Sequence, residues 1–181
     1  MSDRMERAAT AVAIRLATVD DAAALTDFAR QSFLDTFAAD NTPENMALYV
    51  AQAFGAATQT RELTDEASVT LLVEQDGQLV AYAQMSDAPP PACVEGAVPM
   101  ELRRLYVDRG WQGQGLALPL IRAIEAKAVE RGARTMWLGV WDHNTRAIAF
   151  YRKAGYVDVG WQPFVLGRDV QQDRVMARHL E

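Results

Sequence analysis

The chain has 181 residues, half of them hydrophobic and 23% charged, which suits one globular domain with a sizeable core. Its net charge of −6 argues against nonspecific nucleic-acid binding, and its single cysteine, Cys93, excludes an internal disulfide. With one cysteine and two histidines, we expect no metal site. No apolar run reaches the roughly 18 residues that span a bilayer. Residues 1–7 lack the apolar core of a signal peptide, so we expect a cytoplasmic protein without a membrane partner.

The charged residues are unevenly distributed along the chain. Residues 1–100 contain five basic and 15 acidic side chains, a net charge of −10. Residues 101–181 contain 13 basic and nine acidic side chains, a net charge of +4. Two halves of opposite charge could hold two ligands of opposite charge, although solvated surface charge gives the same distribution.

The first predicted elements are a strand and a helix. We expect residues 1–10 to form a flexible tail and residues 11–181 to form a single domain. Residues 11–18 have the composition of a strand. A helix then begins with Thr18 as its N-cap and Asp21 at the third helical position, a variant of the capping box. Apolar residues recur after this start at helical spacing.

A second helix and a hairpin follow. Thr42 as N-cap and Pro43 as first helical residue are typical of a helix start, and Gly55 ends the apolar stripe. Residues 68–86 contain two apolar runs on either side of the Asp-Gly pair at 76–77. Because a tight primed turn requires such a pair, this segment predicts a β-hairpin.

The second half of the chain alternates strands with helices. We expect, in chain order, strand 101–107, helix 115–131, strand 134–141, helix 144–155, and two closing strands at 156–161 and 173–180. Together with the hairpin, this alternation predicts a mixed α/β domain with at least one parallel crossover.

A glycine-rich loop joins the 101–107 strand to the helix that follows it. Its sequence, RGWQGQG over residues 109–115, leaves the first N–H groups of the helix unpaired at the positive end of the helix dipole. The loop predicts a phosphate or pyrophosphate site, and a plain tight turn is the structural alternative. A nucleotide P-loop is excluded because no Gly-Lys pair exists, and a dinucleotide fingerprint is weak because Leu118 replaces its third glycine.

Two motifs in this half resemble those of the GCN5-related N-acetyltransferases. The acetyl-CoA loop of that family, Q/R-x-x-G-x-G/A, is matched at every specified position by residues 112–117, QGQGLA. Residues 141–160 are similar to the family's second hallmark, whose residues stand here at the usual spacings: Asn144, Ala147, Tyr151 and Gly155. The segment 33–50 also resembles polyamine acetyltransferases of the PaiA type.

The resemblance implies the family's fold and its coenzyme. We expect an α/β (mixed α+β) GNAT fold, in which about four helices flank a central twisted mixed sheet of about six to seven strands, and acetyl-CoA as cosubstrate. The pyrophosphate of coenzyme A would bind to the amides of Gln112, Gly113, Gln114, Gly115, Leu116 and Ala117. Main-chain groups of Leu105, Tyr106 and Val107 would pair with the pantetheine amides as an added strand does. Asn144 and Tyr151 would complete the coenzyme site.

The resemblance also implies direct transfer, in which an amine attacks the thioester while both substrates are bound. Tyr151 is the candidate acid for the departing thiolate, with simple packing as its alternative role. Asn144 could equally be a plain helix N-cap. Glu101 is the candidate base and would act through water. Strand alternation predicts that one face of the strand carries Glu101, Arg103, Leu105 and Val107.

The acceptor is expected to be a primary amine, either a small molecule such as a polyamine or a peptide. In the family, the segment after the first strand commonly covers the acceptor site. Here that segment carries aromatic and acidic side chains that suit a cationic amine: Phe33, Asp35, Phe37, Asp40, Glu44 and Tyr49. Trp137, Trp141 and Trp161 are interpreted as packing residues, and Arg109 as a phosphate contact or an exposed flank of the loop. A homodimer is compatible with the family, but the sequence does not require one.

Two other functions stay open at this stage. The chain could be a non-catalytic module that binds acyl-CoA and regulates another protein. It could also be a dinucleotide-dependent oxidoreductase, against which Leu118 argues. Coenzyme binding without acetyl transfer would favour the first, and a response to NADH without one to coenzyme A would favour the second.

Overall fold

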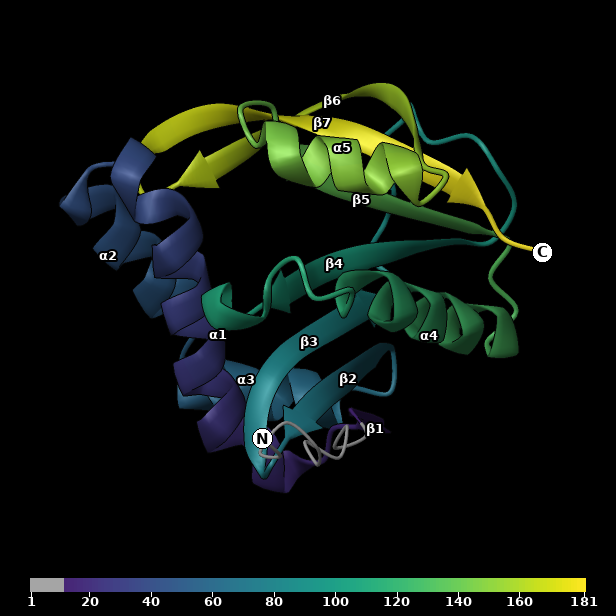
Figure 1. The fold of residues 1–181 in the computed structure, drawn as a ribbon. Helices are drawn as coiled ribbons and strands as arrows, with labels where there is room; N and C mark the ends of the chain where they lie inside the picture. Colours follow the sequence, from purple (N-terminus) through teal and green to yellow (C-terminus); the bar gives the residue numbers. More distant parts are fainter. Residues whose placement is uncertain (1–11) are drawn as a thin grey trace, which may run out of the picture.

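The computed structural model describes residues 12–181, so the tail predicted over residues 1–10 lies outside the described residues. One seven-stranded sheet runs in the order β1-β2-β3-β4-β5-β7-β6. Its strands are β1 (Ala13–Leu16), β2 (Ser68–Gln75), β3 (Gln78–Ser86), β4 (Pro99–Val107), β5 (Thr135–Trp141), β6 (Val157–Leu166) and β7 (Asp169–His179). Over the same residues, the sheet is flanked by α1 (Ala22–Phe37), α2 (Pro43–Ala53), α3 (Ala56–Thr64), α4 (Ala117–Glu130) and α5 (Thr145–Lys153) (Figure 1).

The sheet is mixed, as predicted. Neighbouring strands are antiparallel except β4 and β5, which pair in parallel and are joined through α4. The parallel pairing covers only three residues on each strand, from Pro99 opposite Thr135 to Glu101 opposite Trp137. Beyond these residues the two strands separate, and Figure 1 shows the resulting gap in the middle of the sheet. The predicted parallel crossover is therefore confirmed, and it leaves one edge of β4 open.

Local sequence signals account for several element boundaries. The Thr18 N–H donates to Oδ2 of Asp21 at 2.7 Å, although residues 19–21 form a 3-10 turn and α1 begins at Ala22. The Thr42 hydroxyl accepts from the Asn45 N–H at 3.3 Å and caps α2, as predicted. The predicted hairpin turns through residues 76–77, which both have positive φ.

Helix α3 is not predicted from the sequence. This short helix has a polar sequence, AATQTRELT, and its buried side chains are Gln59 and Glu62. Helix prediction relies on an apolar stripe, which this segment lacks. Polar contacts with the sheet hold α3 in place instead, and they bring Glu62 under the cleft described below. The structure thus has five α-helices within residues 12–181 where about four were predicted.

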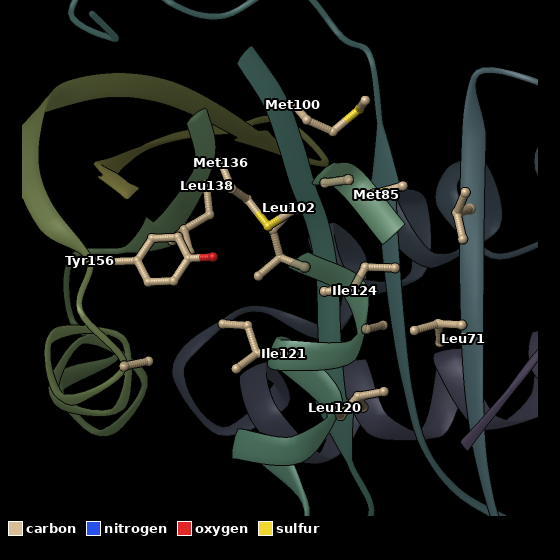
Figure 2. Packing of buried hydrophobic residues seen from close by; sticks show 14 of the residues in the cluster. Leu71, Met85, Met100, Leu102, Leu120, Ile121, Ile124, Met136, Leu138 and Tyr156 are labelled. Atoms are coloured by element: carbon tan, nitrogen blue, oxygen red, sulfur yellow. The ribbon is translucent and has the colours of Figure 1, made fainter. Parts of the chain in front are cut away.

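Two hydrophobic cores cover the two faces of the sheet. On one face, Leu120, Ile121 and Ile124 of α4 are fully buried against strand residues that include Leu102 and Met136 (Figure 2). On the other face, a cluster from α1, α2 and the sheet packs together: Leu25, Phe33, Val50, Phe54, Tyr82 and Leu166. Each fully buried side chain of this size contributes about 1.5–3 kcal/mol. These cores fix β4 from both sides and so fix the walls of the gap.

A β-bulge at Arg103 changes the alternation of β4. Gln84 of β3 pairs with Arg104, but the next residue, Met85, pairs with Leu102, so Arg103 has no partner. Leu105 and Val107 therefore share the face of Leu102 and pack against the α4 core, whereas Glu101 lies on the opposite face. The predicted shared face of Glu101, Arg103, Leu105 and Val107 is wrong because the inserted residue shifts the period by one.

Candidate active site

A large cleft lies where β4 and β5 diverge. Its volume is about 1320 Å³, and its walls come from α1, α2, α3, β4, the glycine loop, the start of α4, β5, α5, β6 and β7. The separation of β4 from β5 beyond Glu101 opens it. The cleft contains nearly every residue that the sequence assigned to coenzyme or acceptor: Phe33, Asp35, Phe37, Tyr49, Glu101, Leu105, Tyr106, Val107, Gln112, Gly113, Gly115, Leu116, Ala117, Asn144 and Tyr151.

The open edge of β4 forms one wall of the cleft. Leu105, Tyr106 and Val107 pair with β3 on one side, and their other side faces the gap rather than β5. Backbone N–H and C=O groups at such an edge are available to an extended ligand that carries amides. This geometry suits an extended amide-containing arm, and the coenzyme role of these three residues stays a prediction.

The glycine loop fits a pyrophosphate at the end of this edge. Gly113 and Gly115 have φ values of +79° and +82°, which favour glycine, and a Cβ on either would meet no atom within 4 Å. Helix α4 then begins at Ala117, and within the described part of the chain no side chain caps its first N–H groups. Open space, bare backbone and an uncapped helix N-terminus together suit an anion.

Side chains of the loop hold it in shape. The Gln112 amide donates to the carbonyl of Val107 at 3.0 Å, and the Gln114 amide donates to the carbonyl of Gly110 at 2.8 Å. Gln114 is not among the residues that line the cleft, so its side chain shapes the loop. Arg146 of α5 donates to Oε1 of Gln112 at 2.6 Å, which brings a cation beside the loop. Arg146 is not among the residues predicted from the sequence, where its only signal is a basic residue two positions after Asn144.

Arg109 is exposed beside the loop, as one of its two predicted roles requires, and it also contacts α1. Its guanidinium donates to the main-chain carbonyl of Asp35 at 2.9 Å, near the end of α1. The same side chain lines the cleft. Arg109 therefore links the glycine loop to the helix that covers the acceptor side.

Helix α5 provides Asn144 and Tyr151. The Asn144 side chain accepts from the Ala147 N–H at 3.2 Å, so it caps the helix. Tyr151 is half-buried, with its ring against Phe150 and Tyr156 at centroid distances of 5.3 and 5.8 Å. Burial raises the pKa of the Tyr151 hydroxyl well above its usual value. The hydroxyl consequently stays protonated over the working pH range, as a proton donor must.

Glu101 faces the cleft from the start of β4. Its Oε2 atom accepts a hydrogen bond from the Ser86 hydroxyl at 3.1 Å. Burial raises the pKa of Glu101, while the Ser86 hydrogen bond and the nearby Arg103 and Arg104 oppose that rise. A carboxylate with a raised pKa in a cleft is suited to accept a proton.

The acceptor side of the cleft is rich in aromatic residues. Phe33 stacks on Tyr49 with a centroid distance of 4.7 Å, Phe37 lies 6.1 Å from Trp141, and Tyr49 lies 5.2 Å from Phe164. Trp141, interpreted from sequence as a packing residue, also lines the cleft. This side therefore offers aromatic rings to an acceptor molecule.

The acidic residues predicted for the acceptor side differ in their surroundings. Asp35 lines the cleft and accepts from the Gln31 amide at 2.8 Å. Asp40 and Glu44 are exposed outside the cleft lining, and Glu44 forms an ion pair with Arg168 at 3.0 Å. Solvent and that pairing satisfy both carboxylates, so their predicted place at the acceptor site is wrong.

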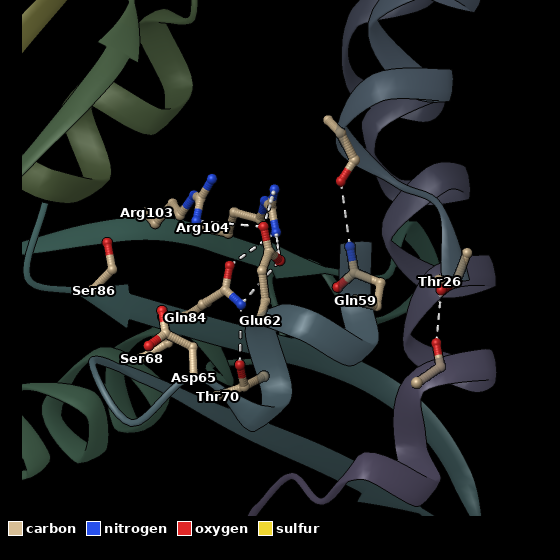
Figure 3. A network of polar contacts seen from close by, with 12 residues as sticks. Thr26, Gln59, Glu62, Asp65, Ser68, Thr70, Gln84, Ser86, Arg103 and Arg104 are labelled. Carbon is tan, nitrogen blue, oxygen red and sulfur yellow. Dashed lines mark hydrogen bonds and ion pairs between the residues drawn. The ribbon is translucent and has the colours of Figure 1, made fainter. Parts of the chain in front are cut away.

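A buried polar network supports the floor of this side. Glu62 of α3 binds Arg104 with an N–O distance of 2.6 Å and also pairs with Arg103 at 3.3 Å (Figure 3). The Gln84 amide donates to Glu62 at 3.3 Å and to Thr70 at 3.2 Å. The network joins α3 to β2, β3 and β4, and it satisfies buried charges that would otherwise be costly.

One carboxylate of the cleft was missed in the sequence. Asp173 of β7 lines the cleft and is 7% exposed. Burial raises its pKa to about 6. It lies outside both motifs used for the family resemblance, at the start of the predicted strand 173–180, so no local pattern could reveal it.

The chain belongs to the acetyltransferase (GNAT) family, whose sequence model matches residues 27–156. An uncharacterized N-acetyltransferase of Lactobacillus delbrueckii subsp. lactis is 30% identical to it, over 83% of this chain and 87% of that protein. The fold is similar to that of PaiA N-acetyltransferase from Thermoplasma acidophilum in complex with coenzyme A, with a TM-score of 0.72, 19% identity, and coverage of 93% and 99% of the two chains. It is also similar to yncA of Salmonella typhimurium with its cofactor acetyl-CoA, with a TM-score of 0.68, 23% identity, and coverage of 94% and 95%.

These comparisons confirm the GNAT family, the GNAT fold and the acyltransferase class predicted from sequence. Within residues 12–181, no three His, Cys, Asp or Glu side chains are grouped so that they could hold a metal ion. The helices of this same part of the chain are all too short or too polar to cross a membrane.

Proposed function

We propose that the protein transfers the acetyl group of acetyl-CoA to a primary amine, by direct attack with both substrates bound. One observation carries this proposal: the open edge of β4 leads into a glycine loop and an uncapped helix N-terminus along one wall of a single cleft. A ligand with an amide-containing arm that ends in a pyrophosphate would fit these three features in the order in which they lie along the wall. The acceptor is a small molecule such as a polyamine, or a peptide, and the compartment we propose is the cytoplasm.

The residues divide into three tasks. The edge of β4 and the loop bind and orient the coenzyme, with Arg146 and Asn144 beside them. Tyr151 donates a proton to the departing thiolate. Glu101 accepts a proton from the acceptor side through water. The aromatic residues of α1 and α2 exclude water from the acceptor end, which strengthens these polar interactions.

The reaction requires more than one group that accepts a proton. An ammonium must lose one proton before its nitrogen can attack the acetyl carbon, and the nitrogen loses a second proton when the amide forms. The carbon–sulfur bond breaks, and the sulfur takes one proton from Tyr151. One of the two nitrogen protons passes through water to Glu101, the other goes to a second acceptor, and after exchange with solvent Tyr151 regains its proton and one proton is released in total.

Isothermal titration of the protein with acetyl-CoA, coenzyme A and NADH in parallel tests this function first. We expect the protein to bind acetyl-CoA and coenzyme A with micromolar affinity and not to bind NADH. A subsequent amine screen should then show acetylation. Binding without any acetyl transfer would support the non-catalytic module instead, and binding of NADH alone would support an oxidoreductase.

A further inference from the structure

Asp173 is a buried carboxylate without a partner in the described chain. It lies opposite Trp141 of β5 and Gln162 of β6, and its side chain reaches the cleft. Burial is the one influence that shifts its pKa, which agrees with the absence of any hydrogen bond or ion pair to it among residues 12–181. Burying an unpaired charge costs several kcal/mol. A ligand cation would remove that cost.

Arg174, Arg103 and Arg104 are already paired with other carboxylates. Arg174, next in the chain, pairs with Asp142 at 2.9 Å and Asp158 at 3.0 Å, away from the Asp173 side of β7. On the cleft side, Arg103 and Arg104 both pair with Glu62. The fold therefore leaves Asp173 available to a cation that comes from outside the chain.

Gly139 provides the space for this carboxylate. A Cβ at Gly139 would lie 3.1 Å from Oδ2 of Asp173 and would overlap the Gln162 amide. Gly139 lies two residues after Trp137 in β5. Trp137 pairs with Glu101, the last β4 residue that pairs with β5. The Asp173 carboxylate thus lies over β5 just where the gap opens, at the inner end of the slot that suits pantetheine.

Aromatic rings line the approach to this point. Trp141 lies directly across from Asp173 in the sheet, and Phe37 packs against the edge of Trp141. Tyr49 and Phe164 form the next pair of rings in the same cleft. Aromatic faces attract cations and keep water out, so an ammonium group is favoured beside this carboxylate.

We infer that Asp173 binds the ammonium group of the acceptor and takes its first proton, a role that rests on the acetyl transfer proposed above. The neutral amine then attacks the acetyl carbon, the carbon–sulfur bond breaks, and Tyr151 protonates the sulfur. Glu101 takes the second nitrogen proton through water. Two carboxylates in one cleft, Asp173 buried and Glu101 half-buried, match the two protons that the nitrogen loses.

The same surroundings select the class of acceptor. A free α-amino acid would bring a second carboxylate beside Asp173, which forms no ion pair with any cation of residues 12–181. Two carboxylates without a cation between them repel each other strongly in a buried site. The acceptor class is therefore an unhindered alkyl primary amine, such as a polyamine end or a lysine-like side chain, rather than a free amino acid.

The experiment compares Asp173→Asn, Glu101→Gln and the wild type, using n-butylamine, spermidine and glycine as acceptors. Asp169→Asn is the matched control, since Asp169 is an exposed acid of the same strand outside the cleft lining. We expect Asp173→Asn to lower kcat/KM for both alkyl amines by about 100-fold or more, with a raised amine KM. Acetyl-CoA affinity should stay within about threefold, as should all constants of the control.

The melting temperature of Asp173→Asn distinguishes the proposed role of Asp173 from a purely structural one. Since Asp173→Asn removes a buried unpaired charge, its Tm should rise by about 2 °C or more, whereas loss of a structural contact would lower it. An Asp173→Asn enzyme within threefold of wild-type kcat/KM would overturn the proposal, as would a preference for glycine. Failure of both alkyl amines with wild-type enzyme that binds acetyl-CoA would also overturn it. Failure of the wild type to bind acetyl-CoA would instead refute the acetyl transfer itself.

Discussion

The position of a Cβ on Gly139 lies 3.1 Å from Oδ2 of Asp173, so a glycine in the middle of β5 makes room for a buried acid of β7. Glycine weakens a strand interior because it costs backbone entropy and packs no side chain. Its presence here keeps the carboxylate over the inner end of the cleft. The first prediction follows directly from this pair of residues.

Gly139→Ala should displace the side chains of Asp173 and Gln162 without blocking the coenzyme loop. We expect kcat/KM for an alkyl amine to fall by about tenfold or more, because small misplacements of reacting groups are costly. Acetyl-CoA affinity should change by less than about threefold. Steady-state kinetics and calorimetry measure both quantities, and unchanged amine kinetics would contradict the relationship.

Gly115→Ala should weaken acetyl-CoA binding more than it weakens folding. The new side chain would occupy the open face of the loop at φ +82°, where an L-residue is strained by about 1–2 kcal/mol. Gly132→Ala is the matched control, since Gly132 has φ +88° and equally open space but lies after the far end of α4. Both variants should lose similar unfolding free energy in urea, while only Gly115→Ala should lose coenzyme affinity, by about tenfold or more.

Tyr151→Phe should lower kcat while leaving coenzyme binding nearly unchanged. The ring keeps its packing on Phe150 and Tyr156, and only the hydroxyl that donates the proton is lost. General acids contribute typically about 10²–10⁴-fold, so we expect a fall in kcat of about 100-fold or more. A variant with wild-type kcat in a coenzyme A release assay would show that Tyr151 only packs.

The pH dependence of catalysis should follow Asp173. Because its pKa is raised to about 6, the carboxylate protonates and loses its role as base below that pH. The kcat/KM for an amine should therefore rise as pH increases through about 6, and Asp173→Asn should lack this step. Other ionisable groups that line the same cleft come from α1, α2, α3, β4, the glycine loop and α5: Asp35, Tyr49, Arg61, Glu62, Glu101, Arg103, Arg104, Tyr106, Arg109, Arg146, Tyr151 and Lys153. The comparison with Asp173→Asn isolates Asp173 from them.

The same shift predicts the direction of a stability change. A carboxyl whose folded pKa lies above its unfolded value binds more protons when folded, so its ionisation opposes folding. The free energy of unfolding of wild type relative to Asp173→Asn should fall as pH rises from about 4 to about 6, by an amount on the order of 2–3 kcal/mol. Urea unfolding of both proteins across this range measures it, and parallel curves would refute the shift.

Breaking the network under the acceptor side should destabilise the fold. Glu62→Ala leaves Arg104 buried and unpaired, since the two side chains are only 7% and 8% exposed. We expect a loss of about 3–5 kcal/mol in the free energy of unfolding. Glu44→Ala is the control, because its ion pair with Arg168 is exposed and should cost less than about 1 kcal/mol. Equal losses in chemical denaturation would contradict this distinction.

Local signals predicted most elements correctly, and tertiary context explains the exceptions. The hairpin around residues 76–77 and the capped start of α2 follow from short-range turn and capping chemistry. Helix α3 escaped prediction because polar contacts to the sheet, centred on Glu62, replace an apolar stripe. The bulge at Arg103 escaped because nothing in the strand sequence marks which residue is left unpaired.

The sequence by itself determined the strand–glycine loop–helix that suits a pyrophosphate, because positive-φ glycines and an open helix N-terminus are properties of a few consecutive residues. It also determined the succession of elements that defines the family. Only the tertiary structure decided which acids face the cleft. Glu101 and Asp173 both line it, while Asp40 and Glu44 lie outside, because strand order and register bring residues from distant segments to one cleft. Such pairings depend on the packing of the whole sheet, which no local pattern contains.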